Sequence, residues 1–155
     1  MEEPILNSHN KFEYPPMHTC EHILNQTMVR MFGCERSKNA HIERKKSKCD
    51  YELQESPTDE QIEEIERCVN QVIQSNLPVN ISYVNREEVL DVLDLNKLPK
   101  NVSSTLRLVS IGDYDICACI GTHVNNTSEI GVFKIISHTY ENGVLRLRFK
   151  LLDSK

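Results

Sequence analysis

The spacing of hydrophobic residues changes along the chain, and this change limits the folds that its 155 residues can adopt. Apolar side chains follow helical spacing over residues 17–33 and about 58–75. Further along they follow the pattern of strands with one buried face, over 105–111, 114–119, 130–138 and 143–152. Helices early and strands late predict an α+β fold, a mostly antiparallel sheet with helices packed on one face.

Local signals define where several of these elements begin and end. Thr58 and Gln61 have the spacing of a capping box, which opens a helix, and Gly33 fits the C-cap of the preceding helix. Tyr-Glu-Asn-Gly at 140–143 is a hairpin turn signal between the last two strands. Three further elements are expected: a hairpin within 39–54, a strand ending at 84, and a short helix from Asn85 to about Leu93.

Length and composition favour a globular protein inside the cell. Two prolines precede Met17, so residues 1–16 are expected to form an extended lead-in and 17–155 a single domain. No apolar run approaches the roughly 18 residues that span a bilayer, and the N-terminus is acidic where a secretory signal would be basic. We therefore expect a cytoplasmic protein whose six cysteines are reduced thiols.

Charge is distributed unevenly around a net value of −5, which argues against a general nucleic-acid coat. Residues 35–48 contain six basic and two acidic side chains, whereas 50–66 contain eight acidic and no basic ones. Two solvated faces would explain this pattern, and so would a local basic patch that binds a polyanion.

Two pairs of metal-binding residue types stand four positions apart. His18 and His22 fall at the start of the first predicted helix, where this spacing places both imidazoles on one face. Cys119 and His123 form the second pair, and together the two pairs make a complete Cys/His₃ set of the kind that binds Zn²⁺ tetrahedrally. Cys117 competes with Cys119, since alternate residues of a strand share a face.

The sequence around these pairs resembles a known family. The segment His18-Thr-Cys-Glu-His22-Ile-Leu resembles the HxxxH motif of the editing domain of alanyl- and threonyl-tRNA synthetases. Cys119-Ile-Gly-Thr-His123-Val, with the following Thr-Ser-Glu-Ile-Gly, resembles that family's second motif. Residues 65–70 and 111–115 resemble further family segments, so the similarity covers about residues 17–150. The short stretch before His18 is most similar to the smallest freestanding members, the AlaX proteins.

This resemblance implies a fold, a cofactor and an activity. It implies an α+β domain with Zn²⁺ between the first helix and the sheet, held by His18, His22, Cys119 and His123, and it favours Cys119 over Cys117. The implied activity is hydrolysis of mischarged tRNA, with Ser- or Gly-tRNA(Ala) favoured. No activation module, nucleotide loop or anticodon-binding extension is visible, so ligase activity is not expected.

Glu21 departs from the family pattern, which often has Thr at this position. Three interpretations remain open: a surface carboxylate, a partner of a metal-binding histidine, or the general base of catalysis. His18 and Glu21, three positions apart in a helix, share a face. Asp115, His41 and Asp50 are weaker candidates than Glu21, and each is interpreted first as a turn, core or solvated residue.

The expected partner is aminoacylated tRNA, bound at its 3′ acceptor end, with neither DNA nor a membrane involved. Lys and Arg contacts to phosphate would supply this binding. One candidate patch comprises Arg36, Lys38, Arg44, Lys45 and Lys46. A second comprises Arg146, Arg148 and Lys150, which alternate on one strand face.

Two other functions fit part of the pattern. A zinc-stabilised RNA-binding module without catalysis would use the same four ligands structurally. The motif His18-Thr-Cys-Glu-His22 also resembles the HTxEH motif of S-ribosylhomocysteine lyase, but that interpretation leaves His123 unexplained.

Overall fold

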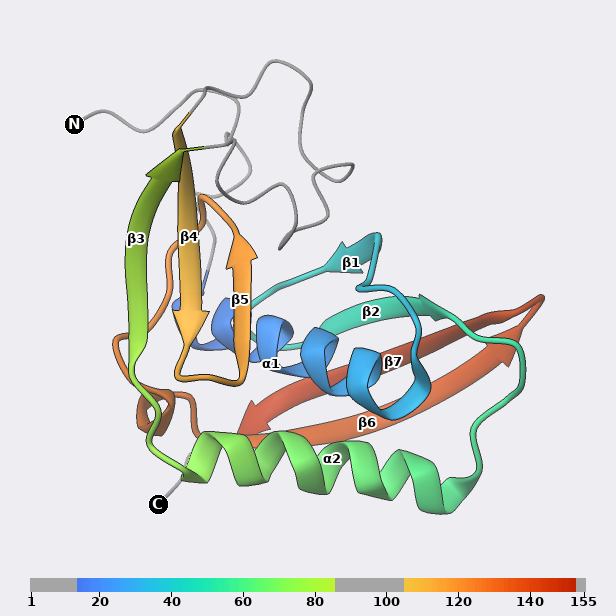
Figure 1. Ribbon diagram of the computed structural model, residues 1–155. Coiled ribbons are helices and arrows are strands. Elements are labelled where there is room, and N and C mark those ends of the chain that lie inside the picture. Colours follow the sequence, from blue (N-terminus) through green and yellow to red (C-terminus); the bar gives the residue numbers. More distant parts are fainter. Residues whose placement is uncertain (1–13, 86–104, 153–155) are drawn as a thin grey trace.

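The computed structural model describes residues 14–85 and 105–152 (Figure 1). The short helix expected after Asn85, and all but the last three residues of the expected 1–16 lead-in, lie outside these ranges. The elements run in the order α1 (Pro15–Phe32), β1 (Asn39–His41), β2 (Ser47–Glu52), α2 (Asp59–Gln74), β3 (Val79–Asn85), β4 (Thr105–Ile111), β5 (Asp115–Ala118), a 3₁₀ turn (Thr127–Glu129), β6 (Val132–Glu141) and β7 (Val144–Leu152). The α+β class predicted from the sequence is confirmed.

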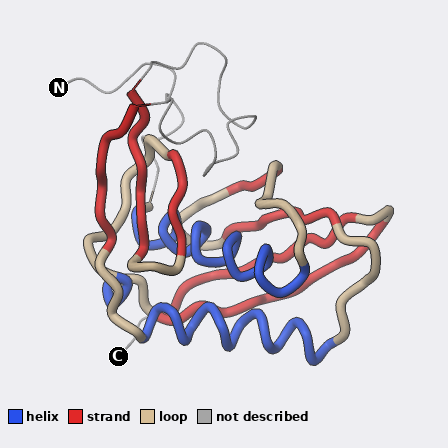
Figure 2. The backbone as a smooth tube through the Cα atoms, in the orientation of Figure 1, coloured by secondary structure: helices blue, strands red, loops and turns tan. Residues whose placement is uncertain are grey.

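The strands form two antiparallel sheets. One has the order β1-β2-β7-β6 and the other β3-β4-β5. In Figures 1 and 2 the three-stranded sheet stands at one end of the four-stranded sheet, with α1 passing beside β5 and α2 alongside β6. The sequence pattern predicted the antiparallel pairing but not the division between two sheets, which brings β5 against α1.

α2 follows the rules for an amphipathic surface helix. The predicted capping box is present, with Gln61 N donating to Thr58 Oγ1 at 3.1 Å and Thr58 N donating to Gln61 Oε1 at 2.9 Å. One face packs into the core through four buried side chains, Ile62, Ile65, Val69 and Ile73. Cys68 and Val72, also expected to point inward, are half-buried.

α1 is buried on more than one face. It begins at Pro15 and ends before Gly33, whose φ of 68° is the left-handed C-cap conformation that glycine adopts without strain. Its apolar core side chains are Met17, Cys20, Ile23, Leu24 and Met28, and its buried polar side chains are Thr19, His22, Asn25 and Thr27. A helix that buries polar groups on a second face requires partners for them, and β5 and the segment after it supply several.

The four-stranded sheet contributes the rest of the core from one face. Its buried side chains include Tyr51, Phe133, Leu145, Leu147 and Phe149. The opposite face carries Arg146, Arg148 and Lys150, which alternate with the buried residues of β7 as predicted. None of the described helices is long and apolar enough to cross a membrane.

Candidate metal centre

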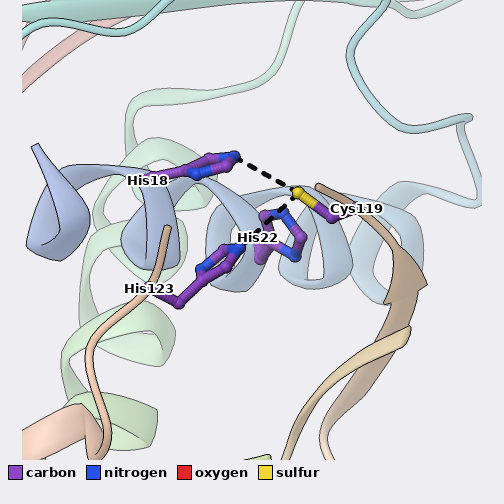
Figure 3. Close-up of side chains that lie close together, drawn as sticks. All are labelled: His18, His22, Cys119 and His123. Atoms are coloured by element: carbon purple, nitrogen blue, oxygen red, sulfur yellow. Dashed lines mark hydrogen bonds between the residues drawn. The ribbon is translucent and has the colours of Figure 1, made fainter. Parts of the chain in front are cut away.

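The structure brings the two pairs of metal-binding residue types together at the junction of α1 and β5. His18, His22, Cys119 and His123 each offer one ligand atom, and these four atoms all lie within 4.8 Å of one another (Figure 3). Cys119 Sγ is 3.6 Å from His18 Nε2 and 3.6 Å from His123 Nε2. Such a group of three imidazoles and a thiol could hold a metal ion.

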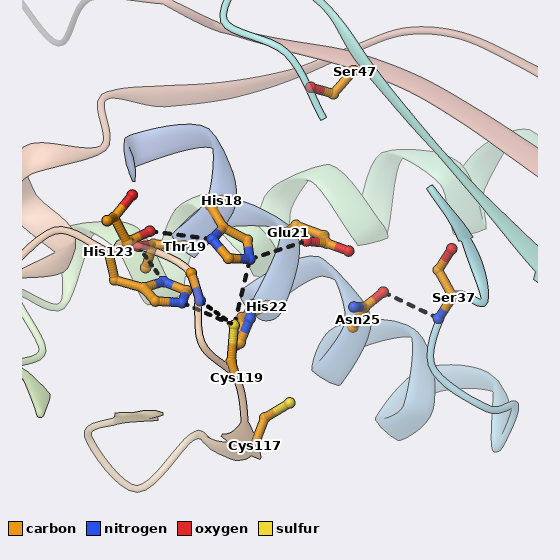
Figure 4. A network of polar contacts seen from close by, with 12 residues as sticks. His18, Thr19, Glu21, His22, Asn25, Ser37, Ser47, Cys117, Cys119 and His123 are labelled. Atoms are coloured by element: carbon orange, nitrogen blue, oxygen red, sulfur yellow. Dashed lines mark hydrogen bonds and ion pairs between the residues drawn. The ribbon is translucent and has the colours of Figure 1, made fainter. Parts of the chain in front are cut away.

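The chain turns sharply after β5, and this turn places Cys119 and His123 in the cluster. Arg107 of β4 donates hydrogen bonds of 2.8 Å to the carbonyl oxygens of both Cys119 and Gly121. The amide of Gly121 lies 3.4 Å from Cys119 Sγ. Cys117 does not belong to the group of four, and its sulfur points away from it in Figure 4.

The outer ring nitrogens of His18 and His123 are held by oxygen atoms. His18 Nδ1 donates to the carbonyl oxygen of Thr122 at 3.1 Å. His123 Nδ1 lies 2.9 Å from Thr19 Oγ1, which also accepts from the amide of Val124 at 3.2 Å. A carbonyl acceptor places the proton on Nδ1 of His18 and leaves Nε2 directed at the cluster, the arrangement typical of histidines that bind metals.

Sequence reasoning did not assign roles to Thr19 and Thr122. Each threonine stands next to one of the four clustered residues, Thr19 after His18 and Thr122 before His123. That adjacency was the only signal available, because the contacts that give the threonines a role join segments more than a hundred residues apart.

Asp115 lies beside His22 and is almost fully buried, at 4% exposed. Its Oδ1 accepts from Arg36 Nη1 at 2.7 Å and from Gln26 Nε2 at 2.8 Å, while Oδ2 accepts from Arg36 Nη2 at 3.3 Å. Oδ2 also lies 3.7 Å from His22 Nδ1. Of the turn, core and solvated interpretations, Asp115 therefore fits the core one. It also lies next to the cluster, which its position in the sequence did not reveal.

Electrostatics in the site favour the protonation states that bind metals. Burial raises the pKa of the Cys119 thiol, but contacts with His123, His18 and His22 outweigh it and lower this pKa to about 3. Burial lowers the pKa of His123 to about 4. Burial opposes ionisation of Asp115, yet His22 and Arg36 bring its pKa down to about 2. At neutral pH Cys119 is thus a thiolate and His123 is neutral.

Glu21 lies at the edge of the cluster. Its side chain is only 16% exposed, and its Oε1 is 3.8 Å from His18 Nε2, the nitrogen that faces Cys119 (Figure 4). This placement does not fit a solvated surface carboxylate. The two remaining interpretations, partner of a histidine and general base, both require the position that it occupies.

The two basic patches differ in how much of their charge is already paired. In the first patch, Arg36 is bound to Asp115, Lys38 lies 2.6 Å from Glu35, and the Arg44 guanidinium stacks 4.7 Å above the Tyr14 ring. Lys45 and Lys46 are exposed. In the second patch, Arg146 forms two hydrogen bonds with Asp50, of 2.8 and 2.9 Å.

The strand register extends the second patch across the sheet. Lys48 of β2 is opposite Arg148, and Lys134 of β6 is opposite Lys150. Opposed residues in antiparallel strands share a face. These four cations therefore lie on the face of the four-stranded sheet that points away from the core.

Comparison with known proteins shows what this chain is similar to. Residues 106–147 match the domain described as the threonyl and alanyl tRNA synthetase second additional domain. The chain is related to this synthetase domain. The matched region contains Cys119 and His123, and the resemblance inferred from the motifs is confirmed.

Curated relatives of the chain include alanine–tRNA ligases. That of Methanococcus maripaludis (strain C6) is 30% identical over 148 residues, which cover 93% of this chain and 17% of the ligase. That of Petrotoga mobilis is 34% identical over 134 residues, 84% of this chain and 15% of the ligase. The alignment over 93% of the chain includes α1 with His18 and His22. This chain spans less than a fifth of the length of either relative.

Proposed function

We propose that this chain is a zinc-dependent hydrolase that deacylates mischarged tRNA, with residues 17–155 acting as one editing domain. One observation supports the proposal: α1 and the segment after β5 bring the ligand atoms of three imidazoles and one thiolate within 4.8 Å of one another. The favoured substrates are Ser- and Gly-tRNA(Ala), because the relationship is to alanine–tRNA ligases.

The residues present fit a zinc ion. Zn²⁺ binds thiolate sulfur and neutral imidazole nitrogen in tetrahedral geometry, and His18, His22, Cys119 and His123 would hold it. The outer nitrogens of His18 and His123 already have oxygen partners, as metal-binding histidines require. When bound, zinc polarises an ester carbonyl and lowers the pKa of a coordinated water.

Glu21 is our candidate for the general base. Its carboxylate is largely shielded from solvent and faces the same nitrogen of His18 that points into the cluster. A carboxylate at this edge would hold the attacking water and accept its proton as the water oxygen bonds to the ester carbon. The proton would then pass to the ribose oxygen as the ester C–O bond breaks. Thr19 and Thr122 would keep two of the imidazoles oriented during this step.

The tRNA acceptor end would be held by phosphate contacts. Arg148 and Lys150, flanked by Lys48 and Lys134, provide such contacts on the outer face of the four-stranded sheet. Arg44, Lys45 and Lys46 of the first patch remain candidates, whereas Arg36 is engaged by Asp115 and Arg146 by Asp50. Binding through a few phosphates weakens with salt, with log K falling by roughly 0.7–0.9 per phosphate for each log unit of salt.

The chemistry of selection favours a second hydrolytic site for small amino acids. An apolar synthetase pocket discriminates weakly against an amino acid that differs by one small group. A polar pocket beside zinc can hydrogen-bond the serine hydroxyl that alanine lacks. Seryl esters would therefore be cleaved and alanyl esters spared.

The test measures deacylation of seryl-, glycyl- and alanyl-tRNA(Ala) by the zinc-loaded protein. We expect hydrolysis of the seryl or glycyl ester, little hydrolysis of the alanyl ester, and loss of activity in His22→Ala. His138→Ala is the matched control, since His138 is exposed on β6 and does not belong to the cluster, and it should retain activity.

Two outcomes would refute the assignment: equal rates on seryl- and alanyl-tRNA, or an unchanged rate in His22→Ala. A third outcome has its own meaning. A protein that binds zinc and tRNA but leaves every ester intact would be the non-catalytic RNA-binding module.

A further inference from the structure

We propose that Asp115 is a positioning residue that fixes the ring of His22 for the metal by accepting its Nδ1–H. The inference rests on the proposed metal centre and adds a residue to it. Asp115 reaches the site from β5, and its Oδ2 lies 3.7 Å from His22 Nδ1.

His22 differs from the other two imidazoles of the cluster in one respect. Among the described residues, its Nδ1 is a buried side-chain atom with no hydrogen-bond partner, in a residue that is 4% exposed. A buried N–H without an acceptor is destabilising, because it has lost its hydrogen bonds to water and gained none in the protein. His18 and His123 each have an oxygen at the equivalent nitrogen, so the site requires a third acceptor to complete the same pattern.

Asp115 has one oxygen available for this purpose. Oδ1 is occupied by two donors, Arg36 Nη1 at 2.7 Å and Gln26 Nε2 at 2.8 Å. Oδ2 has a single, longer bond to Arg36 Nη2 at 3.3 Å and faces His22 Nδ1 at 3.7 Å. The oxygen with spare capacity is therefore the one that points at the unpaired nitrogen.

The carboxylate is also held rigidly enough to orient another group. Three N–H donors from two side chains fix it, and Asp115 pairs with Ile111 at the first position of β5. Gln26 lies one helical turn beyond His22 on α1, so it couples the carboxylate to the helix that carries two of the clustered histidines.

The consequence for His22 is a defined tautomer. A proton held on Nδ1 by Asp115 leaves the lone pair of Nε2 free for a metal. A carboxylate behind a metal-binding imidazole also raises the basicity of that ligand, and losing such a partner typically weakens metal binding 10–100-fold.

A competing explanation is that Asp115 serves only as the buried counter-ion of Arg36. The molecule contains a natural control for this possibility. Asp50 and Arg146 form a pair with the same chemistry, two hydrogen bonds of 2.8 and 2.9 Å, on the sheet that does not carry the cluster. The same Asp→Asn substitution can therefore be made in both pairs.

The experiment measures zinc affinity by competition with a chromogenic chelator, and the visible spectrum of the Co²⁺-substituted protein. Asp115→Asn should raise the zinc Kd about 10–100-fold and alter the Co²⁺ spectrum. In Asp115→Asn, hydrogen bonds from Arg36 and Gln26 to the amide oxygen turn the NH₂ group toward His22. That group donates to Nδ1, so it favours the tautomer with the proton on Nε2, which cannot bind the metal through Nε2. Asp50→Asn should leave both readouts unchanged.

Two further variants separate orientation from ion pairing. Arg36→Gln removes the counter-ion but keeps the carboxylate, and it should lose less affinity than Asp115→Asn. In a His22→Ala background, Asp115→Asn should cause no additional loss. Equal losses in Arg36→Gln and Asp115→Asn, or the same fold-loss from Asp115→Asn with and without His22, would overturn the proposal.

A measurement on the wild-type protein covers the case in which Asp115→Asn does not fold. Ring-nitrogen NMR shifts of the zinc-loaded protein should show His22 protonated at Nδ1, and protonation at Nε2 would overturn the proposal. If the wild-type protein binds no zinc, the proposed function fails. If it binds zinc and folded Asp115→Asn binds it equally well, only the role of Asp115 fails.

Discussion

The two helices of this molecule obey the rules of helix formation to different degrees. α2 is capped by its own side chains, carries Asp59 and Glu60 in its first turn, and has one apolar face. α1 has no side-chain cap, no acidic residue in its first turn, and polar side chains buried beside its apolar ones. Local rules are commonly violated at functional sites, and the helix that violates them carries His18 and His22, two of the four clustered residues.

The buried polar groups of α1 are stabilised from outside the helix. Asn25 Oδ1 accepts from Tyr51 OH at 2.6 Å, and Thr27 Oγ1 lies 2.6 Å from Tyr114 OH. Buried polar groups cost free energy unless they are hydrogen-bonded, so the position of α1 depends on β2 and on Tyr114, the residue before β5. α2 depends mainly on hydrophobic packing. Substitutions in α1 should therefore act on the site, and those in α2 on stability.

The largest effect is expected from removing one candidate ligand from each of the two pairs. His18→Ala combined with Cys119→Ala should abolish stoichiometric zinc binding, because two ligands cannot complete a tetrahedral site. Elemental analysis of the purified protein gives the ratio, which should fall from one zinc per chain to none. The control is His138→Ala with Cys34→Ala, which leaves the cluster intact. An unchanged ratio in the first double variant would contradict the site.

A core substitution in α2 should have the opposite signature. Ile65 is fully buried, and Ile65→Ala should lower the free energy of unfolding by about 2–5 kcal/mol through lost burial and a residual cavity. Zinc content of the folded fraction should stay the same. Urea denaturation measures the free energy of unfolding. The control is Glu63→Ala at an exposed position of α2, whose free energy of unfolding should stay within about 0.5 kcal/mol of the parent. If fully folded Ile65→Ala had lost its zinc, α2 would act on the site as α1 does, and the contrast between the two helices would fail.

The same contrast explains what the sequence could and could not predict. The limits of α2, the hairpin of β6 and β7, and the spacing of the two pairs all follow from residues close together in the chain. Thr58 with Gln61, and Asn-Gly at 142–143, are such local signals. The division into two sheets and the approach of Asp115 to His22 depend on packing between distant segments, which periodicity does not encode. The apolar face of α1 followed from helical spacing, but the burial of Thr19, His22 and Asn25 on this helix was unpredictable for the same reason.

The smallest effect concerns the start of α2. Thr58→Ala removes the acceptor for the Gln61 amide and should lower the free energy of unfolding by about 1 kcal/mol. Thr58→Ser keeps a hydroxyl at the same position and should retain most of that stability, so the pair separates capping from a general loss of side-chain contacts. Urea denaturation of both variants is the measurement, with zinc content unchanged in each. α1 offers no equivalent substitution, since Tyr14 at its N-cap makes no side-chain cap. If Thr58→Ser were as unstable as Thr58→Ala, the hydroxyl would not be what stabilises the N-terminus of α2. The stability of this helix would then come from hydrophobic packing alone.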